Sequence, residues 1–146
     1  MRDKVPAVKC NRIVAWLGSL LASVSLLFAQ QNAAPKGIFG IYGQSSPGHD
    51  SIRVTRRPGG KIGLAVKLYY ANGHTCQLEA EGEWRAAHLV VMAEGADPNQ
   101  PCSLNAYFSR GRISLKDEGW RCAPVYCGTR GKLDKVSLSK SSVDRK

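Results

Sequence analysis

The strongest pattern in this sequence is an alternation of apolar and polar side chains with a period of two, which begins after residue 50. It is clearest at Ile62, Leu64, Val66 and Leu68, which fall on one side of an extended chain with Lys67 on the other. A period of two is typical of a β-strand with one buried face. Strands are expected at residues 52–55, 62–68, 76–81, 88–92, 102–108, 112–116 and 132–138.

Two of these stretches depart from strict alternation. The run His88–Met92 is almost continuously apolar, which predicts a strand covered on both faces. In the last stretch, Leu133 and Val136 do not fall on one side of an extended chain. Glycine and proline turn signals recur at short intervals, and no stretch has a helical period. We therefore predict an all-β domain, a small antiparallel sandwich or barrel of about seven or eight short strands.

The first 29 residues have the pattern of an export signal. Residues 1–12 carry four basic side chains and one acid, and Ile13–Ala29 is almost wholly apolar. This order is typical of a helical signal peptide, and we predict cleavage after Ala29 because polar residues follow at once. An uncleaved membrane anchor is the alternative. The expected organisation is a signal peptide at 1–29, a linker at 30–36, an exported β domain at 37–138 and a flexible tail at 139–146, in the periplasm or outside the cell.

The cysteine count supports export. Removal of the signal takes Cys10 away and leaves an even set, which predicts two disulfides in an oxidising compartment. Zinc binding is disfavoured because the set contains no C-x-x-C pair. A hairpin turn after Phe108 would bring Cys102 near Cys122 and leave Cys76 with Cys127, although four cysteines allow three pairings. The cysteines of the expected disulfides are Cys76, Cys102, Cys122 and Cys127.

Residue types that carry catalysis are present but form no recognised motif. The histidines have no metal-ligand spacing, and no G-x-S-x-G sequence occurs. Glu79, Glu81 and Glu83 are expected to line one solvent-facing side of a strand. Strand alternation is expected to place Glu83 and Arg85 on the face opposite His88, which disfavours a nuclease-like trio. We predict no catalytic residues, no metal and no cofactor.

Charge is the most informative remaining feature. The chain has a net charge of +10, and residues 1–29 hold four of its 21 basic and one of its 11 acidic side chains, so the rest carries +7. Positive fields attract anionic polymers, lipid headgroups, acidic protein surfaces and nucleic acid. Nucleic acid is the least expected of these partners. The candidate anion-binding residues are Arg53, Arg56, Arg57, Lys61, Arg110, Arg112 and Lys116, and a third basic cluster holds Arg130, Lys132 and Lys135.

The stretch from Gly73 to Leu138 resembles small periplasmic domains of proteobacteria. The resemblance is carried by the Cys-bearing strands at His74-Thr75-Cys76 and Cys102-Ser103-Leu104 and by Cys122-x4-Cys127-Gly128-Thr129-Arg130-Gly131. Those domains are mostly of unknown function and are grouped loosely with lysozyme-inhibitor-like proteins. The resemblance implies a β-rich, disulfide-stapled, exported domain that inhibits a wall hydrolase or confers immunity to one.

Three functions follow from these observations. The leading one is a non-enzymatic binding module of the cell envelope with a protein partner, for which an inhibitor or immunity protein is the specific form. Because the domain is basic, an acidic hydrolase or toxin fits better than a basic lysozyme. The alternative is a basic surface that binds an anionic polymer or a membrane. A small secreted hydrolase or nuclease is the second alternative.

Overall fold

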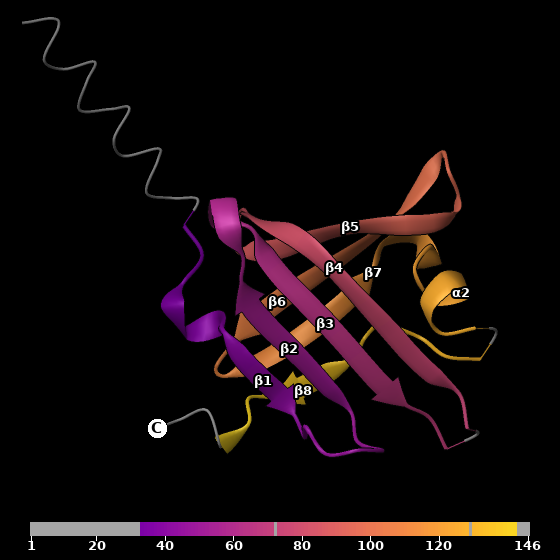
Figure 1. The fold of residues 1–146 in the computed structure, drawn as a ribbon, viewed down its shortest axis with the longest axis horizontal. Coiled ribbons are helices and arrows are strands. Elements are labelled where there is room, and N and C mark those ends of the chain that lie inside the picture. The colour runs from indigo at the N-terminus through magenta and orange to yellow at the C-terminus, as the bar shows by residue number, and fades with distance from the viewer. Residues whose placement is uncertain (1–32, 72, 129, 143–146) are drawn as a thin grey trace, which may run out of the picture. The chain divides into compact units, whose positions relative to one another are not determined.

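The strands form a single antiparallel sheet in which sequence neighbours are also spatial neighbours (Figure 1). The computed structural model describes residues 33–71, 73–128 and 130–142, and residues 34–146 form one compact unit. The expected signal segment at 1–29 lies outside the described residues, among which no helix is long and apolar enough to cross a membrane. The strands are β1 (Gly40–Gly43), β2 (Ser51–Arg56), β3 (Ile62–Tyr69), β4 (Thr75–Arg85), β5 (His88–Asp97), β6 (Gln100–Ser109), β7 (Arg112–Asp117) and β8 (Ser137–Ser139).

The sheet curls into a nearly closed barrel, which confirms the predicted all-β class. Lys140, just after β8, forms a bridge with Tyr42 of β1. The amide of Ser141 then donates to the carbonyl of Ile41 at 2.8 Å. These contacts bring the last strand to the first. They also fall within 139–146, so the first residues of the expected flexible tail belong to the sheet.

The core fills the barrel with the inward side chains of alternate positions. Ile62, Leu64, Val66 and Leu68 are all buried, as the alternation predicts. The run His88–Met92 corrects one expectation, because Met92 is 52% exposed and the strand is covered on one face only. A short apolar run cannot by itself distinguish one buried face from two.

The chain ends of the sheet differ from the expected strands. Leu133 is fully buried, but of the expected strand at 132–138 only Ser137 and Leu138 belong to β8, which pairs with β7 and ends at Ser139. Lys135 has φ 60°, a left-handed conformation that an extended strand cannot contain. The short strand β1 was not predicted, because Gly40–Gly43 has a glycine at each end and too few residues to show a period.

Strands β4 and β5 pair only next to the turn that joins them, and a short helix lies where the rest of the two strands diverges (Figure 1). Strand β4 pairs with β3 from Thr75 to Gly82, but it pairs with β5 only from Gly82 to Arg85. Helix α2 (Ala123–Tyr126) contacts both β4 and β5. The helix therefore covers core side chains where the two strands no longer cover them.

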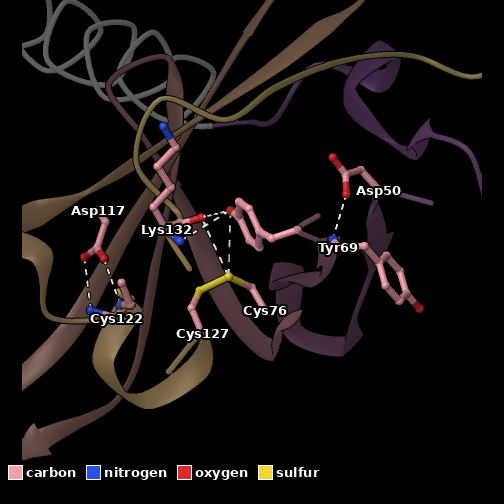
Figure 2. The surroundings of a disulfide bond; sticks show 9 residues. Asp50, Tyr69, Cys76, Asp117, Cys122, Cys127 and Lys132 are labelled. Carbon is pink, nitrogen blue, oxygen red and sulfur yellow. Dashed lines mark hydrogen bonds between the residues drawn. A yellow bond between two sulfur atoms is a disulfide. The ribbon is translucent and has the colours of Figure 1, made fainter. Parts of the chain in front are cut away.

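Two disulfides tie α2 to the sheet, in the pairing that the expected hairpin favoured. Cys76 of β4 is bonded to Cys127 (Figure 2), and Cys102 of β6 is bonded to Cys122. One bond therefore lies at each end of the helix. Gly131 packs against the first bond, since a Cβ there would lie 3.0 Å from Cys76 Sγ and 2.6 Å from Cys127 Cβ. Disulfides of this kind indicate an oxidising, extracytoplasmic compartment.

Polar groups complete the attachment of α2. The buried carboxylate of Asp117, which ends β7, accepts hydrogen bonds from the backbone N–H groups of Cys122 at 3.1 Å and Ala123 at 2.9 Å (Figure 2). These two amides lie at the start of the helix, where no carbonyl of the helix can accept them. The Tyr70 hydroxyl donates to the backbone carbonyl of Lys132, in the chain that follows the helix.

A buried tyrosine makes the stability of the barrel sensitive to alkaline pH. The Tyr42 hydroxyl donates to the carbonyl of Ile38 at 2.8 Å, and burial raises the pKa of Tyr42 to about 12. Because this pKa lies above the ordinary value near 10, folding favours the protonated form. We expect the free energy of unfolding to fall by about 1.4 kcal/mol per pH unit between about pH 10 and 12 from this residue.

Urea unfolding of the wild type and Tyr42→Phe across this range measures that effect. The variant is expected to lose about 1 kcal/mol at neutral pH, the typical value of one hydrogen bond, and to fall less steeply above pH 10. Equal slopes for the two proteins would contradict the assignment to Tyr42.

Candidate functional site

The outer face of β1–β4 carries a hollow of about 460 Å³, which we call the basic hollow. Its floor is made of small side chains, among them Ser51, Gly63 and Ala65. Its charged lining residues are Arg53, Arg57, Lys67 and Glu79. Three cations and one carboxylate around a floor of small residues give a concave surface with an excess of positive charge.

The strand register explains how this surface forms. Arg53 of β2 is paired with Ala65 of β3, and Ser51 with Lys67. Arg53 and Lys67 are therefore diagonal neighbours on one face, a relation that places positions about 7–8 Å apart. Gly63 leaves room for a third cation, because a Cβ there would lie only 2.7 Å from Arg57 Nε.

The cations of the basic hollow differ in how they are neutralised. Arg57 contacts two carboxylates, Glu79 at 3.3 Å and Glu81 at 3.9 Å. Arg53 and Lys67 form no ion pair with any residue that the structure describes. Two adjacent like charges repel each other, so an anionic group held between them would be bound favourably.

The first predicted anion-binding cluster is brought together only in part. Arg53 and Arg57 line the basic hollow, whereas the guanidinium of Arg56 lies 4.2 Å from the centre of the Phe39 ring. Lys61 is 3.8 Å from Glu81. Lys67 is not among the candidates predicted from the sequence, because no other lysine or arginine accompanies it within β3. The signal for it is its outward position in the alternation of apolar and polar residues.

The second predicted cluster does not form one site. Arg110 and Arg112 line a different hollow of about 360 Å³, at the end of the barrel with Trp84 and Phe108. The Arg112 guanidinium already donates to the hydroxyls of Ser139 and Ser137. Lys116 is paired at 2.7 Å with Glu118, and the hydrogen bond from this lysine is the main reason that the pKa of Lys116 is raised. These cations are dispersed over separate surfaces or already paired.

The carboxylates on β4 face outward as expected, and each has a basic partner. Glu83 is 2.8 Å from Arg85, whose hydrogen bond lowers the pKa of that carboxyl. One expectation about this region was wrong, because His88 lies on the same face as Glu83 and Arg85. The chain turns at Ala86–Ala87 and pairs Arg85 directly with His88, and paired residues project from the same side of a sheet.

Within this trio, Glu83 and Arg85 are paired with each other, whereas His88 has a partner outside it. The His88 ring is stacked on Tyr107 with the ring centres 4.9 Å apart, and the Glu83 carboxylate is held by Arg85. Among the described residues, no group of three or more His, Cys, Asp or Glu side chains could hold a metal ion. Cys76, Cys102, Cys122 and Cys127 are all in disulfides, so none of the four supplies a free thiolate.

Comparison with protein-family models, with curated proteins and with solved structures finds no match to this chain. The resemblance to lysozyme-inhibitor-like periplasmic domains therefore stays a prediction. What the structure establishes is an extracytoplasmic type of domain, an eight-stranded barrel-like sheet with two disulfides and a basic hollow on its outer face.

Proposed function

We propose that this chain is a non-enzymatic binding module of the cell envelope that holds an acidic protein partner in the basic hollow. The observation that supports the proposal is the pair Arg53 and Lys67, which are diagonal neighbours on one face of the sheet and have no carboxylate partner among the described residues. A carboxylate of the partner would accept hydrogen bonds from both cations, and charge-assisted bonds of this kind are among the stronger ones in proteins.

The shape of the hollow favours a carboxylate carried on a protruding side chain. The outward positions of β3 are occupied by Gly63 and Ala65 before Lys67 is reached. The Arg57 side chain occupies the room over Gly63, so the depth that a side chain from another protein would fill lies over the small residue Ala65. An acidic wall hydrolase or toxin is the form of partner that both the charge and the proposed inhibitor or immunity role favour.

A matched pair of variants tests this proposal. We expect the oxidised protein to capture a stoichiometric envelope protein from an extract, and the double variant Arg53→Ser/Lys67→Ser to lose it. The control Lys132→Ser/Lys135→Ser has the same net charge, with both substitutions at exposed positions, and should retain the partner. If Arg53→Ser/Lys67→Ser captured as much of the partner as the control variant does, the proposal would be contradicted.

Salt separates this proposal from the polymer or membrane alternative. A protein interface is expected to persist at high salt because it also buries apolar surface. Capture of polyanions alone, lost as salt rises, would favour the alternative, because exposed charges are screened.

A further inference from the structure

The chain around α2, at residues 119–128 and 130–132, carries exposed apolar side chains and exposed cations that are close in sequence. Trp120 is 56% exposed and Val125 is 42% exposed, and Pro124 between them is also exposed. The basic side chains of the segment, Arg121, Arg130 and Lys132, are exposed as well. No Asp or Glu occurs between Gly119 and Lys132.

The fold holds Trp120 in this position at a conformational cost. Its φ is 58°, in the left-handed region that is unfavourable for a residue with a large side chain, and Gly119 before it has φ 69°. Cys122, two residues later, is fixed by its disulfide and by the Asp117 carboxylate. Strained residues that the surroundings hold in place are concentrated at functional sites. Here the residue in the left-handed conformation is an exposed tryptophan.

We propose that this segment is a docking surface for an anionic lipid bilayer. Tryptophan is favoured at the level of the lipid headgroups, where its ring is half in an apolar and half in a wet environment. Arginine and lysine beside it would meet the negative charge of the headgroups. The closest preceding carboxylates do not oppose this contact, since Glu118 is paired with Lys116 and Asp117 is buried.

The proposal is independent of the basic hollow, because the two surfaces share no residue. Residues 34–146 are used for the test, since they form a compact unit with both disulfides, and the apolar segment 13–29 would itself bind lipid. The background variant Trp84→Phe leaves Trp120 as the single tryptophan of this fragment.

The experiment is a titration with vesicles of phosphatidylglycerol and phosphatidylcholine, followed by tryptophan fluorescence and by vesicle flotation. We expect a blue shift of Trp120 emission and quenching by a lipid-borne quencher. In flotation, Trp120→Ser should bind these vesicles about tenfold more weakly. The control Tyr69→Ser, which removes an aromatic side chain that is 38% exposed on β3, should bind as the unsubstituted fragment does.

Three results would overturn the proposal. They are equal flotation of Trp120→Ser and the control, equal binding to pure phosphatidylcholine, and no association with the anionic vesicles. If the fragment bound a soluble protein through Trp120 and bound no vesicles, the surface would be a protein interface, and the proposal would again be overturned. Loss of envelope-protein capture on Arg53→Ser/Lys67→Ser tests the basic hollow separately.

Discussion

Replacing Cys76 and Cys127 together by serine is expected to lower the free energy of unfolding by about 4 kcal/mol. The bond closes a loop with a sequence separation of 51, and the entropy that a cross-link removes from the unfolded chain grows with loop length. The folded state should also lose contacts, because this bond fixes the end of α2 that packs beside Gly131. Urea unfolding under non-reducing conditions measures the change.

The second disulfide supplies the matched comparison. Cys102 and Cys122 have a sequence separation of 20, so replacing both by serine should lower the free energy of unfolding by about 3 kcal/mol. Because the two bonds hold one short helix, the quadruple variant should lose less than the sum of the two effects. An unchanged free energy of unfolding after replacement of Cys76 and Cys127 would contradict the structural role given to α2.

Asp117→Asn is the second substitution with a large expected effect, a loss of about 3 kcal/mol in the free energy of unfolding. The carboxylate is 3% exposed and accepts one backbone N–H with each oxygen. An asparagine of nearly the same shape offers one acceptor, and its amide group would face an N–H donor. One buried donor would therefore lose its partner, and the charge-assisted bonds would be lost too.

The control for this substitution is Glu94→Gln, which also removes one carboxylate charge but at an exposed position of β5. It should change the free energy of unfolding by less than about 0.5 kcal/mol. Thermal or urea unfolding of both variants decides the matter. Similar small losses for the two would show that Asp117 does not hold the start of α2.

The sequence was sufficient for the fold class, and among the three possible disulfide pairings it favoured the one that the structure has. The period of two at Ile62–Leu68 identifies a half-buried strand without further information. A hairpin of fixed register also brings Cys102 near Cys122, since Ser109 pairs with Arg112 and Leu104 with Asp117. Both inferences rest on local geometry, which a strand pattern and a turn determine together.

What could not be predicted depended on register between strands that a pattern does not specify. The grouping of Arg53 with Lys67 requires the β2–β3 pairing. The position of His88 on the same face as Arg85 depends on a two-residue turn, and a slip of one residue reverses every side chain of a strand. The left-handed residue Lys135, which interrupts the last strand, has no signal in its residue type.

The most direct test of the basic hollow is an NMR titration of isotope-labelled residues 34–146 with a short polyglutamate peptide. We expect amide shifts to concentrate at the basic hollow, around Arg53, Gly63, Ala65 and Lys67, and Arg53→Ser/Lys67→Ser to abolish them. Shifts spread evenly over all exposed cations, or centred at Arg110 and Lys116, would contradict the claim that this hollow recognises acidic groups.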